Sequence, residues 1–368
     1  MNQWFEKECH SPCQVSADNA QKRQATLTKP MGSLGKLEEL AVKFSAWQQT
    51  DTPEIKHIMV RVFAGDHGIC HQNVSAFPQE VTMQMVLNFI NGGAAISVLS
   101  EAEQANFAVV NMGLSTPLPH ADDVLQHPQL INIDLGPGTA DFSHSEAMTD
   151  TQVKQALTTG KEITSSYLSQ HNTIDLFIGG DMGIGNTSSA SAIYCSLLGI
   201  SPTQACGPGT GIDSAGVSRK ARIIERALTL HKLDYYSDKS THSNDINAYD
   251  VLRKVGGFEI AALAGTYIAM AQHKIPSLVD GFISTAAALI AVNLNPSCRD
   301  WLLFSHQSAE PAHTIALHHL QAQPLLNIGM RLGEGSGAAI CIPLLRSALT
   351  LHNNMATFEE AAIAGKKQ

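Results

Sequence analysis

Short apolar stretches recur along this 368-residue chain, and most of them end at a glycine or a small polar residue before a helical pattern begins. Such stretches are typical of buried parallel strands, whose carboxyl ends carry the ligand site in open α/β sheets. Six of them predict an open, mostly parallel sheet. They cover residues 58–64, 107–110, 131–133, 174–178, 276–279 and 302–304.

Helical windows alternate with these strands. In the window 218–232, Ile224 and Leu228 belong to an apolar stripe opposite Arg222 and Glu225, as expected for a helix that lies on a sheet. The alternation predicts a three-layer α/β/α fold with a Rossmann-like sheet. The windows cover residues 81–99, 153–169, 188–198, 218–232, 248–272 and 283–294.

Both ends of the chain carry helical patterns outside the strand-forming region. We therefore expect a small helical domain from both termini, with residues 1–50 as its N-terminal part and 336–368 as its C-terminal part. The large α/β catalytic domain would cover residues 51–335. The polar stretch 234–247 is rich in Ser, Asp and Asn, which predicts a solvated loop and a candidate lid.

Composition narrows the class of protein. A formal charge of −9 and the absence of a long Lys/Arg run argue against a nucleic-acid or anionic-membrane surface. Seven scattered cysteines without CxxC spacing predict reduced thiols. The first residues include Glu6, Lys7 and Glu8 where a signal peptide would be apolar, and we expect no apolar run of about 18 residues. These features predict a soluble, cytoplasmic protein.

One carboxylate stands out near the C-terminus. The sequence RLGEGSGA at 331–338 leads into an apolar helical run and places Glu334 in a glycine-lined turn. Glycines on both sides would let a flat ligand approach the backbone closely, and the helix start would supply N–H groups. Glu334 is therefore our candidate catalytic base. The alternative is a glutamate that only complements a helix dipole.

Two further glycine-rich turns are candidates for binding a nucleotide. Asp181 ends a predicted strand, and Gly183, Gly185 and Asn186 follow it before a helix, which is a plausible phosphate or ribose turn. The spacing is not that of the GxGxxG dinucleotide motif. The second turn, CGPGTG at 206–211, is followed by Lys220, and loop amides with one lysine can hold a phosphate. Either turn could instead be a tight connection.

A metal site is a weaker hypothesis. Asp66, His67 and His306 stand at predicted strand ends, but no HExxH or HxH pattern supports metal binding. The histidines 313, 318 and 319 lie on a predicted helix, where we expect them to face solvent or to pack. A serine nucleophile would need a GxSxG turn, which the sequence lacks.

Eight blocks between about residues 28 and 354 together resemble the nicotinate-nucleotide:dimethylbenzimidazole phosphoribosyltransferases of cobalamin nucleotide loop assembly. So many blocks in register are far more specific than any one of them. The blocks are KPMGSLG at 29–35, GDHG at 65–68, PQEVT at 78–82, GDMGIGNT at 180–187, KVGGF at 254–258, DGF at 280–282, SHQSAE at 305–310 and RLGEGSG at 331–337.

The resemblance implies transfer of phosphoribose from nicotinate mononucleotide to 5,6-dimethylbenzimidazole, with inversion at the anomeric carbon. The products are α-ribazole 5′-phosphate and nicotinate. It implies no metal or organic cofactor, and it implies a homodimer whose pockets are completed across the interface. A phosphoribosyltransferase for another acceptor base and a non-catalytic nucleotide-binding regulator remain alternatives. A metallohydrolase that uses Asp66, His67 and His306 is a weaker one.

The resemblance also implies roles for individual residues. Glu334 would be the base and Asp181 the second acidic group, although the family usually has Glu where this chain has Asp181. The nucleotide and its phosphate would be bound by Gly183, Ile184, Gly185, Asn186, Gly207, Gly209, Thr210, Gly211, Lys220 and Ser308. The benzimidazole pocket would contain Phe77, Gln84, Met85, Met182 and Leu332.

Overall fold

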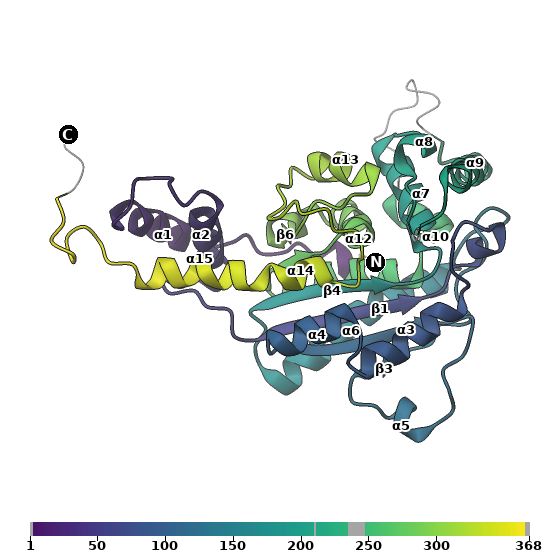
Figure 1. Ribbon diagram of the computed structural model, residues 1–368, viewed down its shortest axis with the longest axis horizontal. Helices are drawn as coiled ribbons and strands as arrows, with labels where there is room; N and C mark the ends of the chain where they lie inside the picture. Colours follow the sequence, from purple (N-terminus) through teal and green to yellow (C-terminus); the bar gives the residue numbers. More distant parts are fainter. Residues whose placement is uncertain (1–2, 210, 235–246, 365–368) are drawn as a thin grey trace.

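The computed structural model describes residues 3–209, 211–234 and 247–364. A six-stranded sheet with every pair parallel forms its centre, in the order β3-β2-β1-β4-β5-β6 (Figure 1). All six predicted strands are confirmed. Their bounds are β1 Ile58–Gly65, β2 Asn106–Gly113, β3 Leu130–Asn132, β4 Leu176–Met182, β5 Ser277–Val279 and β6 Leu302–Phe304.

The strand order reverses beside β1. The chain builds outward from β1 to β3, returns to place β4 on the other side of β1, and then continues outward to β6. In the register of the central pairs, Val62 lies between Val109 of β2 and Gly180 of β4. In open parallel sheets a ligand binds outside the carboxyl ends of the strands near such a reversal. The topology therefore predicts a ligand site near the residues that follow β1 and β4.

Helices connect and cover the strands. The α-helices are α1 Gln14–Thr26, α2 Lys36–Gln48, α3 Glu80–Ile90, α4 Ala95–Ala102, α5 Asp122–Leu125, α6 Asp150–His171, α7 Asn186–Leu198, α8 Pro202–Ala205, α9 Ser214–Leu230, α10 Ala248–Val255, α11 Phe258–Gln272, α12 Phe282–Leu294, α13 Pro311–His319, α14 Ser336–Ile340 and α15 Ile342–Asn354. The 3₁₀ helices are η1 Trp4–Glu6, η2 Gly68–Gln72 and η4 Pro296–Trp301.

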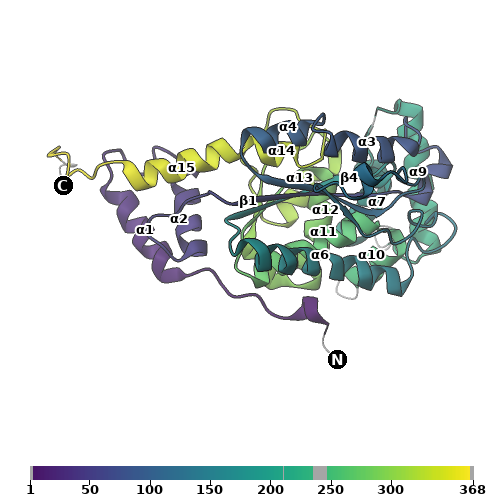
Figure 2. The ribbon, with the colours of Figure 1, turned by 90° about the horizontal axis from the view of Figure 1, so that it is seen from below.

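The predicted three-layer sandwich is confirmed. Helices α3, α4 and α14 lie on one face of the sheet, and α6, α10 and α11 lie on the other (Figure 2). Helix α11 is buried all round because α6 covers the side that faces away from the sheet. Gly265 permits that close packing, since a Cβ on it would overlap the backbone of Leu157 in α6. The core is continuous through both layers.

Two predicted helices are each broken in two. The window 81–99 contains α3 and α4, separated at Asn91, Gly92 and Gly93, and Gly92 has a φ of +77° that a continuous helix does not allow. The window 248–272 contains α10 and α11, separated at Gly256 and Gly257. Both predictions missed the glycines that end a helix, because they relied on hydrophobic periodicity alone.

The expectation about apolar runs also needs correction. The segment Glu80–Ala102 is long and apolar enough to cross a membrane by length and composition. In the structure this segment is not one helix, because it contains both α3 and α4, and these helices contact β1 and β2. The buried sheet therefore accounts for its apolar side chains.

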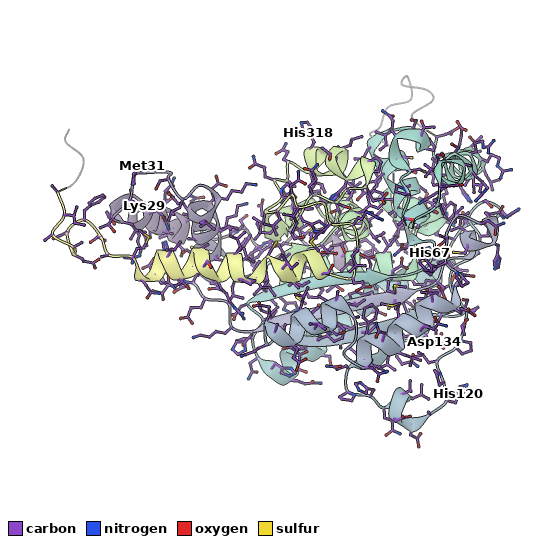
Figure 3. The ribbon with its side chains drawn as sticks, viewed as in Figure 1. Lys29, Met31, His67, His120, Asp134 and His318 are labelled. Atoms are coloured by element: carbon purple, nitrogen blue, oxygen red, sulfur yellow. The ribbon has the colours of Figure 1, made fainter. Side chains whose placement is uncertain are left out.

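Helices from the two ends of the chain pack together beside the sheet. Helix α2 contacts both α1 and α15 (Figure 1), and Arg23 of α1 donates hydrogen bonds to the carbonyls of His352 and Asn353 in α15. Met31 lies on the loop between α1 and α2 and is 81% exposed (Figure 3). Helix α14 instead packs on α4 and β4. The domain boundaries after residues 50 and 335 stay a prediction.

The remaining expectations about the chain have mixed outcomes. All seven cysteines are free thiols. On α13, His313 is fully buried and its ring lies 2.9 Å from the Thr285 hydroxyl, while His318 points outward (Figure 3). Most of the candidate lid at 234–247 lies outside the described residues, as does Thr210 of the second glycine turn.

Candidate active site

A cavity of about 300 Å³ opens at the carboxyl ends of β4, β5 and β6. Its wall combines the turn between β4 and α7, the start of α12, the loop after β6 and the loop that precedes α14. The structure thus brings together segments that are more than 150 residues apart in sequence. The predicted site residues that line it are Phe77, Asp181, Met182, Gly183, Ile184, Asn186, Gly209, Ser308, Leu332 and Glu334.

Glu334 lies in an unusual backbone conformation. Its φ is +64°, and Gly333 and Gly335 on either side have φ values of +86° and +89°. A non-glycine residue in the left-handed region costs about 1–2 kcal/mol. Such strain persists only where the surroundings hold it, and it is concentrated at functional sites. The neighbouring glycines are therefore needed for this turn as well as for space around the carboxylate.

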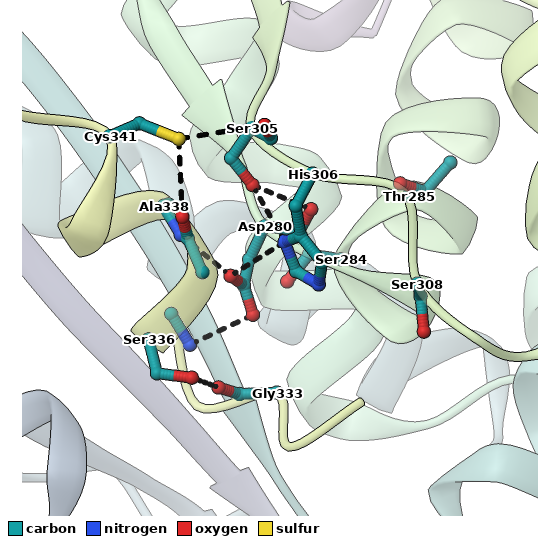
Figure 4. A network of polar contacts seen from close by, with 12 residues as sticks. Asp280, Ser284, Thr285, Ser305, His306, Ser308, Gly333, Ser336, Ala338 and Cys341 are labelled. Atoms are coloured by element: carbon teal, nitrogen blue, oxygen red, sulfur yellow. Dashed lines mark hydrogen bonds and ion pairs between the residues drawn. The ribbon is translucent and has the colours of Figure 1, made fainter. Parts of the chain in front are cut away.

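A buried aspartate holds the Glu334 turn. Asp280, directly after β5, accepts hydrogen bonds from the N–H groups of Gly335 at 3.1 Å and Ala338 at 2.9 Å (Figure 4). Ser336 donates its hydroxyl to the carbonyl of Gly333 at 2.7 Å. From the sequence we expected the N–H groups at this helix start to be available to a ligand. That expectation is wrong for Gly335 and Ala338, because Asp280 occupies them.

The carboxylate of Glu334 faces the cavity without a partner. The residue is 7% exposed, and among the described residues no group hydrogen-bonds to its side chain. Burial raises the pKa of Glu334 to about 7, and the charge of Asp280 adds to this effect. A carboxyl with that pKa is ionised in about half of the molecules at neutral pH, which suits a general base.

Asp181 is the second carboxyl of the cavity. It accepts hydrogen bonds from Ser284 at 3.0 Å and from the side-chain amide of Asn186 at 3.3 Å. Burial raises its pKa to about 8, with smaller contributions from the charges of Asp280 and Glu334. Asp181 is therefore mostly protonated at neutral pH when the cavity holds no positive charge. The cluster of carboxyls therefore favours a ligand that carries a positive charge.

The turn after β4 is shaped by its glycines. Gly185 has a φ of +99° and directly precedes α7, and a Cβ on it would lie 2.6 Å from the sulfur of Cys70. A Cβ on Gly183 would overlap the carbonyl of Gly65 at the end of β1. Gly183 lines the cavity, whereas Gly185 supports the turn from behind. The N-terminal end of α7 contributes Asn186 and Thr187 to the wall.

Lys220 lies one layer behind the wall. It is 1% exposed, burial lowers its pKa, and its ammonium donates a hydrogen bond to Thr187 at 2.8 Å. Of the second glycine turn, Gly209 lines the cavity and donates its N–H to Glu310 at 3.1 Å. Gly207, Gly211 and Lys220 are not part of the cavity wall. Lys220 is connected to the cavity through Thr187.

Apolar side chains surround the outer part of the cavity. Phe77 and Leu332 are 52% and 58% exposed, and Met182, which is half-buried, lines the same cavity. Gln84 and Met85 lie on α3 and are not among the residues that line the cavity. Arg331 brings a positive charge to the same rim.

Sequence reasoning did not assign several wall residues to this site. They come from the segments after β5 and β6 and from the edges of motifs that were already singled out. The rule that ligands bind at the carboxyl ends of parallel strands could have found most of them. They are Thr187, Gly281, Phe282, Ile283, His306, Glu310 and Arg331.

The residues considered for a metal have other partners. Asp66 accepts hydrogen bonds from Thr82 at 2.6 Å and from Ser115. The ring of His67 lies 2.7 Å from a Glu259 oxygen in a fully buried pair. Within residues 3–209, 211–234 and 247–364, no three His, Cys, Asp or Glu side chains are grouped so that they could hold a metal ion.

Comparisons with known proteins give a consistent result. A family model described as phosphoribosyltransferase matches residues 9–363. The nicotinate-nucleotide–dimethylbenzimidazole phosphoribosyltransferase of Pseudomonas fluorescens is 50% identical over 365 residues, which are 99% of this chain and 99% of that protein. The protein of the same name from Ectopseudomonas mendocina is 47% identical over 366 residues, covering 100% of this chain and 99% of the relative.

A solved structure agrees with these relatives. The crystal structure of the nicotinate-nucleotide–dimethylbenzimidazole phosphoribosyltransferase from Thermus thermophilus superimposes with a TM-score of 0.85 at 37% identity. The match covers 96% of this chain and 100% of that one.

Proposed function

We propose that Glu334 is the general base of a transfer carried out in this cavity, since the chain belongs to the nicotinate-nucleotide–dimethylbenzimidazole phosphoribosyltransferase family. The enzyme moves phosphoribose from nicotinate mononucleotide to 5,6-dimethylbenzimidazole. The products are α-ribazole 5′-phosphate and nicotinate, and the step belongs to the nucleotide loop assembly of cobalamin biosynthesis.

One observation carries the assignment of Glu334. Its carboxylate is held at the wall of the cavity, without a hydrogen-bond partner among the described residues, and its pKa is raised to about 7. A carboxylate that binds no other group is available for a proton from the substrate. A base with a pKa near the working pH gives the largest contribution, typically 10²–10⁴-fold.

The proton balance explains why a base is needed. The pyridinium of the nucleotide leaves as a neutral pyridine ring, so its departure requires no acid. A benzimidazole nitrogen attacks the anomeric carbon through its lone pair, and positive charge would build up on the base. Glu334 takes the proton from the other ring nitrogen as the bond forms. Attack opposite the leaving group converts the β nucleotide into the α product.

The carboxyls Asp181 and Asp280 suit a reaction that brings positive charge to this site. The pyridinium nucleotide and the oxocarbenium-like transition state both bring positive charge to a site with several buried carboxyls. A bound cation favours the ionised form of Asp181, whose pKa is about 8 in the free protein. We propose that Asp181 stabilises the transition state electrostatically, held in place by Ser284 and Asn186.

The phosphate is proposed to lie against the N-terminal end of α7. This helix has 13 residues, and Asn186 and Thr187 of its first turn line the cavity with Gly209 and Ser308. The dipole of a helix start favours an anion. The buried ammonium of Lys220, at 2.8 Å from the Thr187 hydroxyl, adds positive charge behind the same point.

The acceptor base is proposed to lie between Phe77, Met182 and Leu332. These side chains give the outer cavity the apolar surface that a dimethylated aromatic ring needs. Gln84 and Met85 would contribute only if α3 approached the cavity. The preference for dimethylbenzimidazole over adenine or a phenolic base is part of the proposal, and competition between the three acceptors in one reaction mixture measures it.

A homodimer and a cytoplasmic location are also proposed, and the family resemblance supports both. Light scattering on the purified protein tests the dimer, because a mass of one chain, 39.4 kDa, would contradict it. Fractionation of cells that express the protein tests the location.

The test of the function combines purified protein, nicotinate mononucleotide and dimethylbenzimidazole without added metal. Chromatography follows the riboside phosphate, and NMR assigns its anomer. We expect an α product and one nicotinate for each riboside formed. Absence of product with the nucleotide still bound would contradict the assignment and favour a regulator, and a β product would contradict direct displacement.

A further inference from the structure

We propose that Asp280 is a positioning residue that holds Glu334 in its catalytic geometry and supplies a negative charge beside it. Asp280 lies directly after β5 and is fully buried, and it is not among the residues that line the cavity. It therefore holds the Glu334 turn without contacting the substrate itself. The inference rests on the proposed role of Glu334 as the general base.

The hydrogen bonds of Asp280 fit its carboxylate form. One oxygen accepts the N–H of Gly335 at 3.1 Å, and the other accepts the N–H of Ala338 at 2.9 Å. The N–H of Gly337 also contributes. Burial raises the pKa of Asp280, and these backbone donors oppose that rise and favour the carboxylate. Because both oxygens accept from backbone donors, one side chain connects the residue after Glu334 to the first turn of α14 (Figure 4). The two ends of the short turn are thus tied to a single rigid group.

This connection matters because the turn is strained. Three successive residues, Gly333 to Gly335, have positive φ, and only the two glycines tolerate this without cost. Without Asp280, the buried N–H groups of Gly335 and Ala338 would lose their acceptor, which is itself unfavourable. We expect the turn to relax when Asp280 is replaced, and Glu334 to leave its position at the cavity wall.

His306 closes the other side of Asp280. Its Nδ1 lies 3.8 Å from an Asp280 oxygen and 3.1 Å from the Ser305 hydroxyl (Figure 4). A Cβ on Gly337 would overlap the imidazole of His306 and lie 3.0 Å from Asp280, so only glycine fits there. Asp280 is thereby enclosed between the turn and the imidazole. Its charge acts on Glu334 without screening by solvent.

Several charged or titratable groups from the surrounding elements line the cavity with Glu334 or, like Asp280, hold its turn. Asp181 lies at the carboxyl end of β4, and Asp280 and His306 follow β5 and β6. Arg331 precedes Glu334 on the same loop, and Glu310 lies further along the wall. Among them, Asp280 is the one whose charge contributes to raising the pKa of Glu334. Removal of this charge should lower that pKa, while burial continues to raise it.

The variant Asp280→Asn tests the proposal, because Asn can accept only at its single oxygen and carries no charge. We expect kcat to fall by about 10–100-fold, as for a misplaced catalytic group, with the KM for nicotinate mononucleotide changed by less than about three-fold. We also expect the acid limb of the pH profile to move below its wild-type position near pH 7. A purely structural role would lower activity without moving the limb.

Glu259→Gln is the matched control. Glu259 is another fully buried carboxylate, it pairs with His67, and its charge acts on Asp181 and does not contribute to the pKa of Glu334. We expect the acid limb to stay at the wild-type pH in this variant. Asp280→Ser gives a second neutral variant in case the buried site does not accept the amide of Asn.

A double variant separates the inference from the function on which it rests. In a Glu334→Gln background, Asp280→Asn should change the residual rate by less than about two-fold, because residues that act as a unit are not additive. An equal loss in both backgrounds, or an unmoved acid limb, would overturn the positioning role. Full activity of Glu334→Gln alone would instead overturn the base assignment.

Discussion

Glu334→Gln is the most informative single change, because it should lower activity and raise stability together. The substitution keeps the size of the side chain and removes only its charge. We expect kcat to fall by about 10²–10⁴-fold, the usual contribution of a general base. The KM for nicotinate mononucleotide should change little, since the phosphate lies at the far end of the cavity in our proposal.

The stability effect follows from the pKa of Glu334. Burial raises this pKa from 4.5 to about 7, which corresponds to a cost of about 3 kcal/mol for keeping the carboxylate ionised in the folded state. Below pH 4.5 the group is protonated in both states and the cost is absent. The cost develops as the pH rises from 4.5 and reaches its full value above pH 7. Gln avoids the cost at every pH.

Urea unfolding of the wild type and the variant at pH 5 and pH 8.5 measures the difference. We expect the variant to gain about 2–3 kcal/mol more at the higher pH than at the lower. Glu225→Gln, on the exposed face of α9, is the control and should gain nothing. If Glu334→Gln gained equally at both pH values, Glu334 would not have the raised pKa on which its assignment depends.

Three further predictions concern the same cavity. The wild-type kcat/KM should rise about ten-fold between pH 6 and pH 8 as Glu334 ionises around pH 7, and a flat profile would exclude a base with that pKa. Lys220→Met should raise the KM for nicotinate mononucleotide about ten-fold without changing the KM for the acceptor base, because the buried ammonium bound to Thr187 lies behind the proposed phosphate position. An unchanged nucleotide KM would show that Lys220 does not help to bind the phosphate. Phe77→Ala should raise the KM for dimethylbenzimidazole by about three- to ten-fold through lost apolar contact, and an equal rise in the nucleotide KM would show that Phe77 is not specific to the acceptor.

The local features of this protein were predictable from its sequence. Six buried strands were visible because apolar runs ended at glycine or polar residues, and the structure has all six. Asp181, Ser308 and Glu334 could be assigned to one site before their positions were known, because the motifs around them together resemble one family. The helix breaks at Gly92 and Gly256 were missed, because hydrophobic periodicity continues across them.

The chemistry of the site was decided by tertiary structure. Nothing near Glu334 in sequence indicates that Asp280, 54 positions earlier in the chain, would take the N–H groups of its turn and raise its pKa. Nor does the sequence show that Lys220 lies behind Thr187 and not in the cavity wall. The physical reason is that strands and turns follow from interactions between near neighbours in the chain. Burial, proton affinity and the pairing of distant polar groups exist only once the elements are packed.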